Sequence, residues 1–343
     1  MNVFVTGGSG FVGGAAVRRL LAQGHQVRAM SRSEKSDDLI RTLGAVPVRC
    51  NLEDVDAEHL TGSDVVIHAA AYVEPWGPSD AWDRVNVGGT QRMLLAARGA
   101  GAKRFIHIGT EAALVHGQDL HEADESYPLA FTSPYPYCRT KALAEQAVRD
   151  ANDVPGRFVT LVLRPRFIWG PGDQTLLPII LKTAAAGRWA WIDRGQKQTS
   201  TTYIENLVDA IELALTLGTP GDAYFILDNG TRSLHDMINA MARAANVGLP
   251  EKSIPYWVAA IVARFCEALW RSLRLSGQPP LTRHAAMVMA RECTLSGDKA
   301  KRELGYQPRF SVEEGMLALS KSLSLGLRLP QVVAQTQRAD DVP

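Results

Sequence analysis

Two side chains with proton-transfer chemistry stand four residues apart near the middle of the chain. Tyr137 and Lys141 begin a segment whose apolar residues recur at helical spacing, so both are expected on one face of a helix. An ammonium beside a phenol favours the phenolate and lowers the pKa of the phenol, which gives a proton donor and acceptor usable near neutral pH. Tyr135 is a weaker candidate, because its fourth neighbour is Arg139, which does not share its protons.

A glycine-rich segment directly follows the first apolar run of the chain and opens a helical pattern. In that context Gly7 permits a tight turn, Gly10 lets the backbone approach a pyrophosphate, and Gly13 allows close helix packing. The free N–H groups at the start of the helix favour the negative charge. We therefore expect a dinucleotide to contact the whole segment, which comprises Gly7, Gly8, Ser9, Gly10, Phe11, Val12 and Gly13.

The second apolar run ends without the acidic residue that binds an unphosphorylated adenosine ribose. Ser31 and Arg32 stand there, followed by Ser33. A guanidinium suits bidentate contacts with a 2′-phosphate. The sequence therefore predicts a preference for NADP(H), with NAD(H) possible and an ordinary solvated arginine as the competing interpretation.

A frame of alternating strands and helices must position these motifs. Short apolar runs occur at 3–6, 26–30, 46–49, 65–68, 105–108 and 158–163, and helical segments separate most of them. This rhythm predicts an α/β, Rossmann-type doubly wound parallel sheet, which binds ligands beyond the carboxyl ends of its strands. We expect residues 1–165 to form the nucleotide-binding domain and 166–325 to form mostly a smaller C-terminal α/β substrate-binding cap. Residues at about 200–228 should return to the first domain, and 326–343 should form a frayed tail.

Composition excludes several other classes of protein. The net charge of the 343-residue chain is +1 and no basic cluster stands out, so a nucleic-acid partner is not expected. The four cysteines lack metal-ligand spacing, so we expect neither a metal site nor a disulfide framework. The first residues lack the order of a signal peptide, which predicts a cytoplasmic protein.

Together these motifs resemble the extended short-chain dehydrogenase/reductase superfamily. The resemblance rests on the glycine loop, on VNVGGT at 85–90, on the tyrosine–lysine pair, and on LRP at 163–165. Within the superfamily the chain most resembles the 3β-hydroxysteroid dehydrogenase-like branch, which includes sterol C4-carboxylate 3-dehydrogenases and 2-alkyl-3-oxoalkanoate reductases. The similarity covers roughly residues 1–320, including AKRELGY at 300–306 and SVEEG at 311–315. It also implies a homodimer formed through a four-helix contact.

The resemblance assigns further residues to the site. It implies that Thr110 binds the substrate oxygen, although Gly109 stands where many relatives have a serine. Glu111 occupies the position of a dehydratase acid, but Ala112 replaces the usual second acid, so we favour a structural role over substrate contact. Arg166 could bind a substrate carboxylate or form a structural ion pair. The expected cofactor contacts are Ala69, Ala70 and Ala71, Asn51 and Leu52 beside adenine, Pro165 and Phe167 beside nicotinamide, and Asn86, which could instead cap a helix.

Aromatic and apolar residues suggest a hydrophobic small-molecule substrate. Tyr72, Trp76 and Trp82 follow the fourth apolar run, and Trp169, Trp189 and Trp191 follow later. The apolar segment 254–275 is interrupted by charges, so it could be a lid over the pocket, a peripheral membrane contact or plain core.

Several functions are compatible with these patterns. The first is an NAD(P)-dependent oxidoreductase acting on a secondary alcohol or ketone, most simply a 3β-hydroxy sterol or 4-carboxysterol. The main alternative is an NADPH-dependent 2-alkyl-3-oxoalkanoate reductase. A nucleotide-sugar epimerase or dehydratase would need a second acid after Glu111, and a non-catalytic redox sensor would not need Tyr137 and Lys141.

Overall fold

A parallel sheet forms the centre of the molecule in the computed structural model, which describes residues 1–153 and 157–325. Its strand order is β12-β7-β5-β4-β1-β2-β3. The strands are β1 (Asn2–Thr6), β2 (Gln26–Ser31), β3 (Val46–Arg49), β4 (Val65–His68), β5 (Arg104–Ile108), β7 (Val159–Pro165) and β12 (Ala223–Ile226). The predicted doubly wound parallel sheet is therefore confirmed. Strand order reverses between β1 and β4, which is where such sheets open a ligand crevice.

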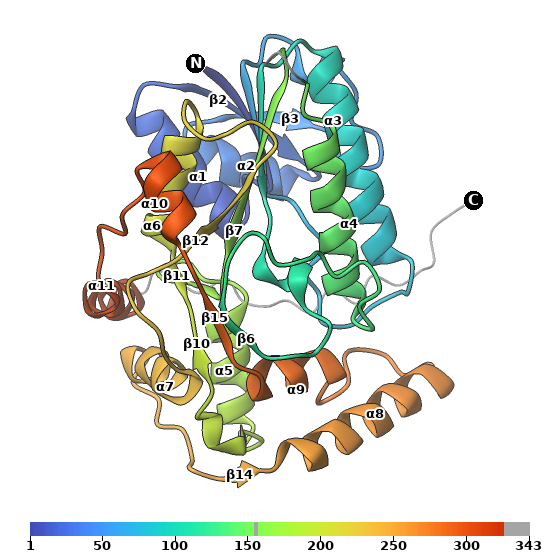
Figure 1. Ribbon diagram of the computed structural model, residues 1–343, viewed down its shortest axis with the longest axis vertical. Coiled ribbons are helices and arrows are strands. Elements are labelled where there is room, and N and C mark those ends of the chain that lie inside the picture. Colours follow the sequence, from blue (N-terminus) through green and yellow to red (C-terminus); the bar gives the residue numbers. More distant parts are fainter. Residues whose placement is uncertain (154–156, 326–343) are drawn as a thin grey trace.

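Helices cover both faces of this sheet because each strand alternates its apolar side chains (Figure 1). In β1, Val3 and Val5 pack into one layer, whereas Phe4 packs into the other. The first layer contains α1 (Phe11–Ala22), α2 (Glu34–Thr42), α6 (Ile204–Ala214) and α10 (Asp298–Leu304). The second contains α3 (Gly89–Gly99) and α4 (Pro136–Asp150).

A smaller lobe lies beyond the carboxyl ends of the strands (Figure 1). Its sheet has the order β13-β10-β15-β6 and contains β6 (Leu120–Ala123), β10 (Gln198–Thr199), β13 (Arg232–Ser233) and β15 (Cys293–Leu295). Two short pairs join β8 (Ile168–Trp169) with β11 (Thr202–Tyr203), and β9 (Trp191–Ile192) with β14 (Ser253–Ile254). The remaining helices are α5 (Leu176–Ala185), α7 (Leu234–Ala244), α8 (Tyr256–Ser272), α9 (Arg283–Ala290) and α11 (Val312–Ser324).

The chain passes between the lobes more than once. β12 and α6 belong to the central sheet and its helix layer although they follow several cap elements, and β6 lies in the cap sheet although it precedes α4. The expected tail, 326–343, lies outside the described residues.

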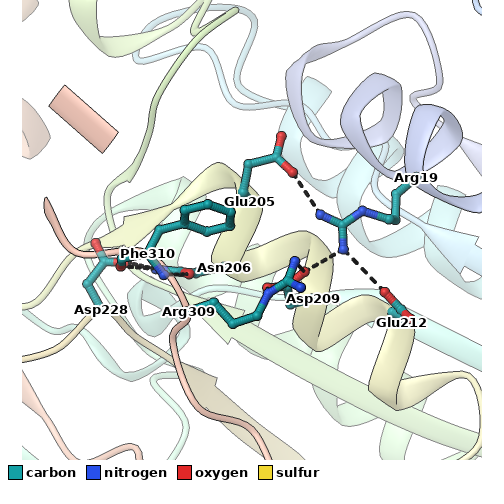
Figure 2. Close-up of polar contacts among 8 residues, drawn as sticks. All are labelled: Arg19, Glu205, Asn206, Asp209, Glu212, Asp228, Arg309 and Phe310. Atoms are coloured by element: carbon teal, nitrogen blue, oxygen red, sulfur yellow. Dashed lines mark hydrogen bonds and ion pairs between the residues drawn. The ribbon is translucent and has the colours of Figure 1, made fainter. Parts of the chain in front are cut away.

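Ion pairs fix the helix that follows the glycine loop (Figure 2). On α1, Arg19 binds Asp209 at 2.5 Å, Glu205 at 2.9 Å and Glu212 at 3.2 Å, all three on α6. Arg309 binds the same Asp209 through two bonds of 2.6 and 2.7 Å. Because these carboxylates are spaced one turn apart on α6, one guanidinium can hold α1 along the length of its neighbour.

A buried carboxylate joins the central sheet to the cap. Asp228, just past β12, accepts hydrogen bonds from Asn206 Nδ2 at 2.9 Å, Thr201 Oγ1 at 2.8 Å and Trp169 Nε1 at 2.9 Å. The backbone N–H of Tyr203 donates a fourth bond at 2.7 Å. Asn206 in turn donates to the carbonyl of Phe310 at 3.0 Å, so the C-terminal segment is held at the same point (Figure 2).

Candidate active site

The glycine loop has the close backbone packing that a dinucleotide site requires. Gly7 has a φ of +70°, which a side chain would strain. A Cβ on Gly13 would lie 2.2 Å from the Gly7 oxygen, so only glycine fits there. Gly10 caps α1 without a side-chain hydrogen bond, which leaves the first N–H groups of the helix open to an anion. These residues fit the pyrophosphate of a dinucleotide.

A buried histidine that the sequence analysis missed supports this loop. Thr6 Oγ1 accepts a hydrogen bond from Ala70 N at 3.0 Å and lies 2.9 Å from His68 Nδ1. His68 Nε2 lies 3.1 Å from Thr90 Oγ1, so both ring nitrogens are hydrogen-bonded to threonine hydroxyls. Burial lowers the pKa of His68 to about 3, so the ring is neutral. The half-buried segment 69–71 follows directly, beside the loop.

Asn86 fixes the backbone of Tyr72, just past the segment 69–71. Its Oδ1 accepts from Tyr72 N at 2.7 Å, and its Nδ2 donates to Tyr72 O at 3.1 Å and to Thr140 Oγ1 at 3.2 Å. Asn86 lies inside the helical segment η2 (Asp83–Gly88), so the alternative that it caps a helix is wrong. The backbone bracing leaves it no free amide hydrogen.

The residues expected to bind adenosine lie at or just past the ends of β2 and β3. Ser31 is buried and donates to the Ser33 carbonyl at 3.1 Å, whereas Arg32 is exposed. Asn51 is engaged by Asp54, to which its Nδ2 donates at 2.7 Å. Leu52 is buried beneath α3. These positions leave the Arg32 guanidinium accessible beside the expected ribose.

Tyr137 and Lys141 both lie in the first turns of α4 at the carboxyl edge of the sheet, but they do not act on each other as predicted. Lys141 is buried, and its Nζ donates to Ile108 O at 3.0 Å and lies 3.3 Å from His107 Nε2. Burial lowers the pKa of Lys141 to about 8, although the negative charge of Glu145 acts to raise it.

The pKa of Tyr137 is raised, so the expectation that Lys141 lowers it is wrong for this structure. Burial is the main cause, and the negative charge of Glu111 adds to it, while a hydrogen bond with Thr110 opposes both. The physical reason is that Lys141 points toward β5 and its carbonyl rather than toward the phenol. Tyr137 is therefore a neutral phenol with a proton to donate.

Thr110, Glu111 and Arg166 form one connected chain beside Tyr137. Thr110 Oγ1 accepts from Ala112 N at 3.2 Å and donates its own proton to Glu111 Oε2 at 2.7 Å. Glu111 forms a buried ion pair with Arg166. The structural alternative for Glu111 and Arg166 is thus the one that the contacts favour. With its proton donated to Glu111, Thr110 offers only lone pairs to a substrate, and its contact with the substrate oxygen stays a prediction.

A second missed histidine comes from the cap. The ring of His284, on α9, lies edge-on to Tyr137 with 5.8 Å between centroids, and its distance to the Tyr135 ring is 5.7 Å. Met287 of α9 packs with Cys138 in the same apolar cluster as Tyr137. The element that covers the tyrosine is therefore α9. The segment 254–275, considered as a lid, forms α8 and packs on the other side of α9.

The aromatic residues expected around a pocket fall into two groups. Tyr72 and Trp82 pack edge to face at 5.3 Å, and Arg271 of α8 lies 5.1 Å from the centroid of half-buried Trp76. The three later tryptophans do not line a pocket, because they belong to the cap core: Trp169, Trp189 and Trp191.

The end of β7 carries the two residues expected beside nicotinamide. Pro165 is buried, and half-buried Phe167 has a φ of 49° in the left-handed region, which is strained for a bulky residue. Phe167 and Phe11 pack against the same apolar cluster, so the end of β7 lies near the start of α1.

Comparison with known proteins assigns the family. The profile of the 3-beta hydroxysteroid dehydrogenase/isomerase family matches residues 4–255. The chain belongs to this family. It is accordingly an NAD(P)-dependent oxidoreductase that acts on hydroxyl and keto groups.

The relatives cover nearly the whole chain. A 4-hydroxy-2-methyl-3-oxo-4-farnesyl-3,4-dihydroquinoline-1-oxide ketoreductase from Stigmatella aurantiaca is 38% identical, over 94% of this chain and 96% of its own. A 2-alkyl-3-oxoalkanoate reductase from Stenotrophomonas maltophilia is 36% identical, over 94% of this chain and 99% of its own. Among solved structures, gox2253 matches with a TM-score of 0.73 and 28% identity, over 94% of this chain and 96% of its own.

Neither a metal site nor a membrane-spanning helix was expected. Within 1–153 and 157–325, no group of three metal-ligating side chains is close enough to hold an ion. The helices of the same described ranges include none with the length and apolarity to cross a bilayer.

Proposed function

We propose that this member of the 3-beta hydroxysteroid dehydrogenase/isomerase family is an NADPH-dependent ketoreductase for 3-oxo acids with long alkyl chains. Bound nicotinamide would supply the hydride. Tyr137 would donate its phenolic proton to the ketone oxygen, and Lys141 would hold the cofactor ribose. The relatives named as reductases, at 38% and 36% identity, support reduction over the sterol oxidation that was considered first.

The proposal rests on which hydroxyl groups near Tyr137 can donate a proton. Thr110 donates its only hydroxyl proton to Glu111, and the pKa of Tyr137 is raised, chiefly by burial. The neutral phenol is therefore the hydroxyl donor at the reacting centre. A ketone oxygen needs such a donor, whereas an alcohol hydroxyl needs an acceptor.

A phosphate-bearing cofactor is proposed from the end of β2. Arg32 is exposed beside Ser31, and residues 31–33 at that strand end include no acidic side chain. On α2, the buried carboxylate of Asp37 is ion-paired with Arg49. This arrangement suits a 2′-phosphate.

The outer face of α8 supports a contact with an anionic membrane surface, from which a lipid-like substrate would arrive. Trp257, Ile261 and Phe265 are 66%, 60% and 67% exposed and recur at four-residue spacing. Exposed Arg264 and Arg271 flank them. Apolar anchors among basic residues favour the interface of anionic lipids.

Substitution of the phenol tests the ketoreductase proposal. Tyr137→Phe should lower kcat for NADPH-dependent reduction of a 3-oxo acid by roughly a hundredfold to ten-thousandfold, because general acid catalysis is lost. Its affinity for NADPH, measured by fluorescence titration, should change little. Tyr135→Phe is the matched control, because it removes the neighbouring phenol. Equal activity of Tyr137→Phe and Tyr135→Phe would contradict the assignment.

A further inference from the structure

Two cap helices pack closely enough to bring a polar side chain against the proposed catalytic tyrosine. On α8, Ala259 and Ala263 are one turn apart, and on α9, Ala286 and Ala290 have the same spacing. All four are in one buried cluster. Their small size lets the two backbones approach, so α9 lies between α8 and the active-site wall (Figure 1).

A single carboxylate fixes the start of α9. Glu267, which is buried on α8, accepts from the backbone N–H of Arg283 and from its Nε, both at 2.7 Å. Thr282 caps the helix by accepting from Ala285 N at 3.1 Å. The next residue, His284, therefore extends from a helix turn that is held at two points.

His284 has free hydrogen-bonding capacity where the reaction is proposed to occur. Its ring faces Tyr137 at 5.8 Å. Within the described part of the chain, neither ring nitrogen of His284 forms a hydrogen bond with another protein group. Neither nitrogen is fully buried. Both nitrogens are therefore open to a hydrogen-bonding partner.

Burial leaves His284 neutral. Burial is the main reason that its pKa is lowered to about 4, with Glu111 and Glu267 opposing the shift and Arg166 adding to it. Near neutral pH the imidazole therefore presents one N–H donor and one acceptor. Arg166 is the less suitable ligand for an anion, because Glu111 already neutralises it.

We propose that His284 binds the carboxyl group of a 3-oxo acid while Tyr137 binds its ketone. This inference rests on the ketoreductase function proposed above. The ketone and carboxyl groups of such a substrate are separated by one carbon atom, so their partners must be adjacent side chains, one from each lobe. The cap would thereby select substrates that carry a carboxyl group beside the ketone.

A matched pair of substrates tests this role. 3-Oxodecanoate and 2-nonanone have the same alkyl chain and ketone, but 2-nonanone lacks the carboxyl group. His284→Phe should raise KM for 3-oxodecanoate roughly tenfold to a hundredfold, as expected when a hydrogen bond to a charged group is lost. The kcat for 3-oxodecanoate and the kcat/KM for 2-nonanone should change by less than about threefold, because Phe preserves the edge-on aromatic contact.

His284→Gln provides a second variant, because its amide can donate in place of the ring N–H. It should recover part of the affinity for 3-oxodecanoate. Wild-type protein should bind 3-oxodecanoate more tightly than 2-nonanone, which tests the same idea without any substitution. If the wild type prefers 2-nonanone, or if His284→Phe affects both substrates equally or neither, the inference is wrong. If wild-type protein reduces neither substrate, the ketoreductase proposal itself fails.

Discussion

The buried lysine beside the crevice should make the folding stability of this protein depend on alkaline pH. The pKa of Lys141 falls from 10.5 to about 8 on folding, mainly because burial disfavours the ammonium. Below about pH 8 the residue is charged in both the folded and the unfolded state, so the folded state carries the full free-energy cost of burying the ammonium. The gap between the two pKa values corresponds to about 3 kcal/mol.

The sign follows from proton binding. Between the folded pKa of about 8 and the unfolded pKa of 10.5, the unfolded chain retains the proton that the folded chain has lost. The free energy of unfolding therefore rises with pH in this window, by at most about 1.4 kcal/mol per pH unit. Replacement by methionine also removes the hydrogen bonds to Ile108 and His107, but that loss adds an offset that does not follow the titration.

The assay is chemical denaturation of wild type and Lys141→Met at intervals from pH 7 to pH 10.5. The difference in unfolding free energy, wild type minus variant, should increase by about 3 kcal/mol across the series. Lys103→Met, which removes an exposed lysine, is the control and should give a flat difference, because water surrounds that side chain in both states. A flat difference for Lys141→Met would refute the reasoning.

Three further predictions concern the cofactor and the membrane. Arg32→Asp should raise KM for NADPH roughly tenfold to a hundredfold while affecting NADH little, and unchanged preference in steady-state assays would exclude the phosphate contact. Gly13→Ala should abolish cofactor binding in calorimetry, because its Cβ would lie 2.2 Å from the Gly7 oxygen; Gly248→Ala, which meets nothing within 4 Å, should bind normally. The double variant Trp257→Ser and Phe265→Ser should no longer sediment with phosphatidylglycerol vesicles, whereas the wild type should; equal sedimentation would argue against α8 as the contact.

The central sheet and the positions of its main motifs could be predicted from local sequence patterns. Strands and glycine loops are encoded locally: an apolar run of fixed length is buried on both faces, and Gly7 and Gly13 satisfy backbone constraints that arise within a few residues. The helix that carries Tyr137 and Lys141 is equally local, because its spacing alone places both residues in adjacent turns.

Tertiary structure decided where those side chains point and what surrounds them. Lys141 bonds to β5 and Glu111 takes the proton of Thr110, so the expected pKa shift of the phenol is reversed. His284 lies 147 positions after Tyr137, and no spacing rule links them; only the packing of α9 between α8 and α4 brings the rings together. Hydrogen bonds, burial and Coulomb interactions act over a few ångströms of space whatever the distance along the chain, so their balance cannot be derived from local patterns.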